Sequence, residues 1–190
     1  MLVFQAPRRT ASPARAVGLP ALFCALAIAA TSAHAAGKAH AHGDARLDVA
    51  IEPQRLSLQF SSPLDNLVGF ERAPRNDKER QQVDAAVARL NAADTMFRID
   101  AAAQCKLAKV ELASAALKLG PVDPAQAKSD HADIDASYEF SCTDATKARH
   151  IDIGLFEFKR LHRLDVQVAA STGQFKRALK PSATRLSLAR

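Results

Sequence analysis

Apolar and polar side chains that alternate with a period of two residues restrict the fold of this chain more than any other feature. The alternation is most regular over residues 134–142, where Ile134, Tyr138 and Phe140 lie on one face and Asp135 and Glu139 on the other. A period of two is typical of a β-strand that buries one face and exposes the other. The pattern therefore predicts a sheet with one face on the core and one face in solvent.

Other segments with this alternation are 45–51, 55–60, 105–112, 151–155 and a C-terminal meander from Leu164 to Leu188 that turns at Thr172-Gly173. Glu52-Pro53-Gln54 separates the first two segments, so we expect these to form a β-hairpin. Between Leu107 and Val110 the apolar phase shifts, which predicts a β-bulge at Ala108-Lys109.

One segment has a helical period instead. Asn76 is a suitable N-cap, and Glu79 follows three residues later as a capping-box partner. The apolar stripe consists of Val83, Ala86, Val87 and Leu90. The sequence thus predicts an α+β fold: a single domain, mostly antiparallel β-sheet, with one main amphipathic helix from about Asp77 to Ala93.

Residues 1–35 have the three parts of a signal peptide. Arg8, Arg9 and Arg15 precede an apolar stretch, and the segment ends in the small residues of Ala33-His34-Ala35. We expect Sec export rather than twin-arginine export, because polar residues follow Arg8-Arg9. Residues 36–190 would then form one periplasmic domain without a membrane segment, and a retained membrane anchor is the alternative.

Loss of this leader changes the net charge and the number of cysteines of the mature chain. It contains three of the 26 basic residues and none of the 20 acidic ones, so the mature chain has a formal charge of +3. No basic run is interleaved with aromatic residues, and we therefore exclude nucleic acid as a partner. Cys24 leaves with the leader, while Cys105 and Cys142 remain. In an oxidising compartment this pair predicts a disulfide, and two thiolate metal ligands are the alternative.

Two histidines near the mature N-terminus are candidate metal ligands. Imidazole is the commonest side-chain ligand for zinc and copper, and His40 and His42 are two residues apart. If the first strand extends backwards, His40, His42 and Asp44 share its solvated face, unless Gly43 forms a bulge. A solvated tail over residues 36–44 is the alternative.

A second group of candidate ligands consists of Asp130, His131 and Asp133, at the junction of a polar loop and a strand. Zinc needs about four ligands, so we predict that both groups contribute to one site if they meet in space. The alternative is an ordinary polar turn. His150 and His162 stand singly beside apolar strands, and we expect structural roles for both.

Zinc is the expected metal, and copper or nickel is favoured only if cleavage follows Gly37. Lys38-Ala39-His40 would then present a free amine and a third-position histidine, a square-planar chelator. No Gly-x-Ser-x-Gly, His-Glu-x-x-His or phosphate-binding glycine loop is present. We therefore predict no catalytic residues and do not expect an enzyme.

Several motifs carry a family resemblance: His40-Ala41-His42-Gly43, Leu67-Val68-Gly69-Phe70-Glu71, His131-Ala132-Asp133, Tyr138-Glu139-Phe140-Ser141-Cys142, Val166-Gln167 and Gly173-Gln174. In this order they resemble the zinc-regulated gene A (ZrgA) family, exported proteins of Gram-negative bacteria long known only as a domain of unknown function. The resemblance covers essentially the whole mature chain. It implies a periplasmic zinc-binding protein that assists zinc acquisition beside a zinc ABC transporter or its binding protein.

This chain departs from the family pattern at two places. Relatives often have a histidine where this chain has Arg72, and a long His/Asp-rich run where only Asp130 and His131 precede Ala132. Both departures remove potential ligands, so we expect about one zinc ion per chain, bound weakly to moderately. A structural or partner-binding module that uses an exposed sheet edge is the alternative function.

Overall fold

A computed structural model of the protein describes residues 42–121 and 132–188. Every described residue belongs to one compact unit, Lys38–Arg190. The predicted leader over residues 1–35 therefore lies outside the described residues. Across the described part of the chain, no helix has the length and apolar character needed to cross a membrane.

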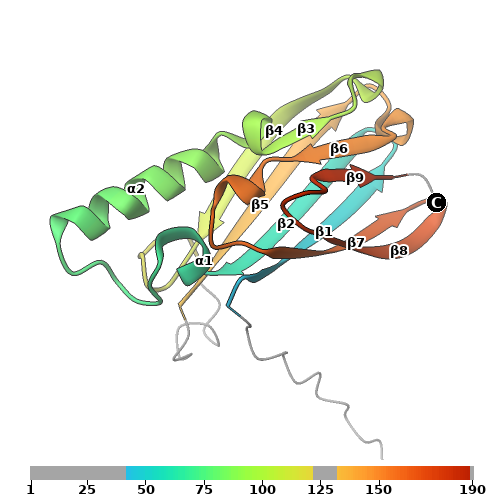
Figure 1. The fold of residues 1–190 in the computed structure, drawn as a ribbon. Coiled ribbons are helices and arrows are strands. Elements are labelled where there is room, and N and C mark those ends of the chain that lie inside the picture. The colour runs from blue at the N-terminus through green and yellow to red at the C-terminus, as the bar shows by residue number, and fades with distance from the viewer. Residues whose placement is uncertain (1–41, 122–131, 189–190) are drawn as a thin grey trace, which may run out of the picture. The chain divides into compact units, whose positions relative to one another are not determined.

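Six strands form a mixed sheet, sheet A, in the order β4-β5-β2-β1-β7-β8 (Figure 1). Their bounds are β1 (Asp44–Glu52), β2 (Arg55–Pro63), β4 (Cys105–Ala113), β5 (Asp133–Cys142), β7 (Arg163–Ala170) and β8 (Gly173–Leu179). The predicted hairpin of β1 and β2 is confirmed, with Glu52 opposite Arg55. All neighbouring strands are antiparallel except β1 and β7, which run parallel.

A second layer covers one face of sheet A. It contains helix α2 (Asp77–Asn91) and a small antiparallel sheet, sheet B, of β3 (Phe97–Ile99), β6 (His150–Ile153) and β9 (Arg185–Ser187) (Figure 1). Shorter elements are α1 (Asp65–Val68), α3 (Ala93–Met96) and the 3-10 helices η1 (Ala101–Ala103), η3 (Ala145–Lys147) and η4 (Leu155–Glu157). The predicted α+β fold is confirmed, although β9 leaves the C-terminal meander and pairs with β6.

The core lies between the two layers. Leu47 and Leu58 of sheet A, Leu90 of α2 and Ile151 of sheet B are completely buried in one cluster. Tyr138 of β5 packs edge-on against Phe97, with 4.8 Å between the ring centroids. Burial raises the pKa of the Tyr138 hydroxyl, which has no hydrogen-bond partner among the described residues. Packing of its ring therefore holds this side chain in place.

Helix α2 agrees with the sequence prediction at its start and in its buried stripe. The Asn76 side chain accepts a hydrogen bond of 2.9 Å from the Glu79 backbone N–H, as an N-cap should. Val83, Ala86 and Leu90 are buried. The helix ends at Asn91 rather than Ala93, because Ala92 leaves the helical conformation and a separate turn of helix, α3, follows.

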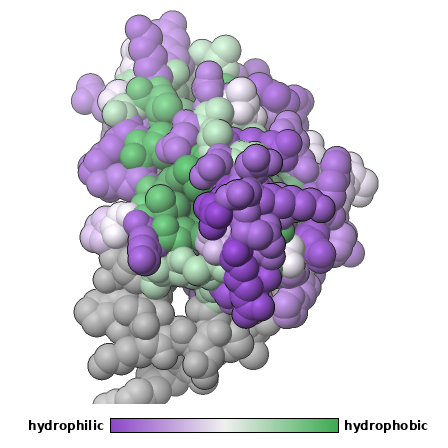
Figure 2. Space-filling model, turned by 90° about the vertical axis from the view of Figure 1, so that its left-hand side faces the viewer, coloured by the Kyte–Doolittle hydropathy of each residue, from purple (hydrophilic) through white to green (hydrophobic). Residues whose placement is uncertain are grey.

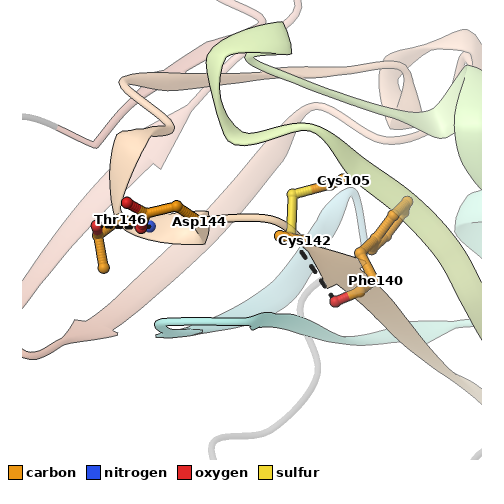
Figure 3. Close-up of a disulfide and its surroundings, with 5 residues drawn as sticks. All are labelled: Cys105, Phe140, Cys142, Asp144 and Thr146. Carbon is orange, nitrogen blue, oxygen red and sulfur yellow. Dashed lines mark hydrogen bonds between the residues drawn. A yellow bond between two sulfur atoms is a disulfide. The ribbon is translucent and has the colours of Figure 1, made fainter.

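Strand β4 is joined to its neighbour by the predicted disulfide. Cys105 and Cys142 face each other at one end of the β4–β5 pair, and their sulfur atoms are bonded (Figure 3). The register of the two strands shifts between Leu107 and Lys109, which confirms the predicted bulge. Since β4 is an edge strand whose Leu107 is 41% exposed, the covalent link secures a weakly packed margin of the sheet.

Replacing both cysteines by alanine should lower the free energy of unfolding by about 3–4 kcal/mol, because the bridge spans 37 residues and restricts the unfolded chain. Urea denaturation of the double variant, beside reduced and oxidised wild type, measures this loss. As a control, wild-type protein taken directly from the periplasm is alkylated without reductant, and its free thiols are counted. Two modified thiols in that sample would contradict the disulfide.

Candidate metal site

The candidate site lies at the end of sheet A where β1 and β7 begin. The Gly43 carbonyl accepts hydrogen bonds from the backbone N–H groups of His162 at 2.8 Å and Arg163 at 3.0 Å. The parallel pairing of these two strands thus starts beside His42. Helix α1, which follows β2, lies at the same end of the sheet because its Asn66 side chain bonds to Gly43.

Strand β1 does not extend back through the histidine pair. His42 and Gly43 form a turn, and Gly43 has a φ of 89°, a conformation that favours glycine. A Cβ atom at this glycine would lie 3.0 Å from Cδ2 of His162. The expected alignment of His42 with Asp44 on one strand face is therefore wrong, and the cause is the interruption at Gly43 that the sequence allowed for.

Asn66 anchors this turn to α1. Its side chain is 1% exposed, and its Oδ1 accepts a hydrogen bond of 2.7 Å from the Gly43 N–H. Its Nδ2 donates to the Asp44 carbonyl at 2.8 Å and to the Ser62 hydroxyl at 3.1 Å. One buried amide therefore joins the start of β1, the end of β2 and the first turn of α1.

His42 faces two carboxylates that this arrangement brings to it. Its Nδ1 lies 3.2 Å from Oδ2 of Asp65 and 3.9 Å from Oε1 of Glu71. The imidazole is 69% exposed, whereas Asp65 is 17% and Glu71 24% exposed. Histidines that bind metals commonly bond a carboxylate through the second ring nitrogen. With Nδ1 so engaged, Nε2 is the nitrogen that can coordinate a cation.

Neither carboxylate was among the candidates drawn from the sequence. Glu71 belongs to the Leu67–Glu71 motif, which gave a family signal but no ligand assignment. Asp65 gave no signal at all, because it sits in a segment without clear periodicity, 23 residues from His42. Only the folded chain brings Asp65 to the imidazole.

The other predicted ligands are distributed as follows. His40, Asp130 and His131 lie outside the described residues. Asp133 opens β5 opposite Pro63, and the carbonyl of the preceding Ala132 accepts a hydrogen bond of 2.8 Å from the Leu64 N–H. Strands β1 and β5 thus both begin beside the Leu64–Asp65 turn, so the two predicted ligand groups attach to the sheet at the same end.

The cluster does not form a complete metal shell. Within residues 42–121 and 132–188, no three His, Cys, Asp or Glu side chains are arranged to hold a metal ion together. The donor chemistry nevertheless fits zinc in part, since Nε2 of His42 is available to a cation while two carboxylates lie on the Nδ1 side of the ring. The described residues therefore provide part of a site, which further ligands would have to complete.

His150 lies elsewhere, on sheet B. Its Nδ1 is 3.5 Å from Oδ2 of Asp100. The backbone N–H groups of Ala102 and Arg149 bond to the same carboxylate and lower its pKa. These contacts fit the structural role that the sequence predicts for His150.

Arg72, at which the family resemblance led us to note a missing histidine, contributes to the start of α2. Its guanidinium donates two hydrogen bonds to Glu79, at 2.6 and 2.9 Å, and lies 4.9 Å from the centre of the Phe70 ring. Glu79 also accepts from the Arg75 N–H at 2.7 Å, rather than from the cap residue Asn76 as a capping box requires. These hydrogen bonds lower the pKa of Glu79 to about 2, and the bond from Arg72 has the largest effect.

A shallow hollow of about 200 Å³ lies between α1 and α2. Figure 2, viewed from the side that holds the start of α2, shows apolar side chains gathered among hydrophilic ones. The hollow is lined by Leu67, Val68, Gln82, Ala85, Ala86, Arg89 and Phe158. It contains no carboxylate or imidazole, so the metal chemistry remains at His42.

These observations define a single α+β domain with an imidazole–carboxylate pair at one end of its main sheet, a pair suited to metal binding. The chain belongs to the ZrgA family: the family model, described as "ZrgA family zinc uptake protein", matches residues 39–188. The family seen in the sequence motifs is thereby confirmed, and with it a role related to zinc uptake. No curated protein sequence matches the chain.

Acidification should destabilise the protein through Glu79. Its pKa in the folded state, about 2, is below the ordinary value of 4.5, so its stabilising effect is complete above pH 4.5 and is lost as the pH falls towards 2. Urea denaturation between pH 6 and pH 2.5 measures this loss. Glu79→Gln should flatten the dependence most and Arg72→Ala in part, since the Arg75 N–H remains. Equal profiles in wild type and Glu79→Gln would contradict the assignment.

Asn66→Ala should lower the free energy of unfolding by about 3 kcal/mol, because it removes the three hydrogen bonds that the buried amide makes with Gly43, Asp44 and Ser62. Gln54→Ala, an amide truncation at the exposed β1–β2 turn, is the matched control and should change stability by less than about 0.5 kcal/mol. Thermal and urea denaturation of both variants provide the comparison. Similar losses in the two variants would show that Asn66 has no special role.

Proposed function

We propose that the protein is a periplasmic zinc-binding accessory protein of zinc uptake and that His42 is a zinc ligand. One observation carries this assignment: Nδ1 of His42 lies 3.2 Å from the Asp65 carboxylate, on a ring that is 69% exposed. This contact fixes the ring orientation and increases the basicity of Nε2, as carboxylate partners of metal-binding histidines do. The family description supports zinc, ahead of copper or nickel, as the cargo.

Binding at this site should be weak to moderate. Zinc prefers four ligands, and the described residues around His42 provide one, Nε2 of this histidine, because Asp65 and Glu71 both lie on the Nδ1 side of the ring. We propose that His40, Asp130, His131 or Asp133 supplies the remaining ligands. Their segments adjoin the site in the chain, since His40 precedes His42 by two residues and His131 precedes Ala132 by one. Water molecules occupy any of the four zinc coordination positions that these residues do not fill.

Export and partnership belong to the same proposal. The leader over residues 1–35 directs the chain to the periplasm, and the Cys105–Cys142 bridge is consistent with an oxidising compartment. The partner that receives the metal is a zinc ABC transporter or its binding protein. The protein's own part is to bind and release the ion, and we assign no catalytic residue.

Titration calorimetry of residues 36–190 tests the zinc site. Wild type should bind about one Zn²⁺ per chain, His42→Ala should bind at least about tenfold more weakly, and Asp65→Asn about 10–100-fold more weakly. The double variant His40→Ala/His42→Ala should lose the most. Affinity should also fall as the solution is acidified below about pH 6.5, because zinc binds neutral imidazole.

His150→Ala is the matched control, since it removes an imidazole from sheet B and should leave zinc affinity unchanged. Equal affinities in wild type, His42→Ala and the double variant would remove His42 from the site. Failure of wild type to bind zinc would favour a partner-binding module that uses a sheet edge. Tighter binding of copper or nickel than of zinc would contradict the choice of metal.

A further inference from the structure

Arg160, in the segment between η4 and β7, extends to the same carboxylate that orients His42. Its Nη1 lies 3.7 Å from Oδ2 of Asp65, the oxygen that faces Nδ1 of His42. A Cβ atom at Gly69 would lie 3.1, 3.4 and 3.5 Å from Nε, Nη2 and Cζ of this arginine. The guanidinium therefore lies against a glycine backbone, in space that any other residue would fill.

Gly69, which lies beside this guanidinium, is the left-handed C-cap of α1, with a φ of 88°, and its N–H donates to the Asp65 carbonyl at 2.9 Å. Arg160 is thus paired with Asp65 beside the glycine that ends α1, although its side chain is 60% exposed.

The charges around His42 consequently include a permanent cation. Asp65 and Glu71 contribute one negative charge each when ionised, and Arg160 offsets one of them because a guanidinium stays protonated in proteins. A zinc ion on His42 would meet this positive charge within about one Debye length, where salt screens it only in part. The arginine and the metal therefore compete for the charge of Asp65.

We propose that Arg160 is a resident counter-cation that lowers the zinc affinity of the His42 site and so favours release of the ion. The inference rests on the proposed function and assigns to Arg160 the tuning of that same site. Nothing in the sequence singled out Arg160. Its role emerges from three elements that fold together: the turn before β1, helix α1 and the segment before β7.

Arg160→Gln tests the inference, because it removes the charge and keeps a polar, though shorter, side chain. At low ionic strength the zinc association constant of this variant should exceed that of wild type by about fivefold or more. The difference should shrink at a salt concentration of about 0.5 M, because screening increases. Arg160→Lys keeps the charge and should stay within about twofold of wild type. Competition with a chromophoric chelator provides the affinities.

Arg55→Gln is the matched control, since it removes one positive charge at the far end of β1, roughly 25 Å away by strand rise. It should leave zinc affinity unchanged. Arg160→Met, which keeps the alkyl packing, replaces Arg160→Gln if thermal denaturation shows that the latter is unfolded.

The outcomes separate the two hypotheses. Equal affinity in Arg160→Gln and wild type would overturn the counter-cation role, and weaker binding in Arg160→Gln would show that Arg160 instead positions Asp65. In both cases a clear loss in His42→Ala would leave the zinc site intact. If wild type and Arg160→Gln bind zinc no better than His42→Ala does, the proposed site itself is wrong.

Discussion

A single buried amide determines the geometry at the metal-binding end of this protein. Asn66 bonds to Gly43, Asp44 and Ser62, and with these three contacts it fixes α1 against the first residues of β1. Asp65 precedes Asn66 in the same turn, so its carboxylate is presented to His42 at 3.2 Å. The positions of His42 and of Asp65, which orients it, depend on this buried contact, because the two residues belong to separate segments.

The contrast between Arg72 and His42 shows how this chain uses a family scaffold. Arg72 forms a bidentate ion pair with Glu79 that stabilises the start of α2. Such an arginine is unavailable as a ligand and is already engaged in the fold. The metal chemistry of the described residues is thereby concentrated at the start of β1, where His42 has carboxylates but no second imidazole nitrogen at bonding distance.

Local patterns in the sequence predicted most of the fold. Alternation of side chains located every long strand, the shift between Leu107 and Val110 located the bulge, and two remaining cysteines indicated the bridge. The parallel pairing of β1 with β7 was not predictable, since no local pattern encodes which distant strand lies alongside. The same limit applies to the site: His42 carried a signal of its own, whereas Asp65 and Arg160 acquire meaning only by contact with it.

The position of β1 in sheet A has a consequence for the order in which the molecule forms. This strand is the first of the described chain, yet one of its two neighbours, β7, begins only at Arg163. An exported chain emerges on the periplasmic side with its N-terminal strand first, and pairing between segments so far apart is slow because a long loop must close. The hydrogen bond between Gly43 and His162 can therefore form only when most of the chain is present. The same holds for the ion pair between Asp65 and Arg160. Assembly of the complete charge cluster around His42 is in this way coupled to completion of the fold, and a chain that ends before Arg160 lacks the cation that opposes zinc.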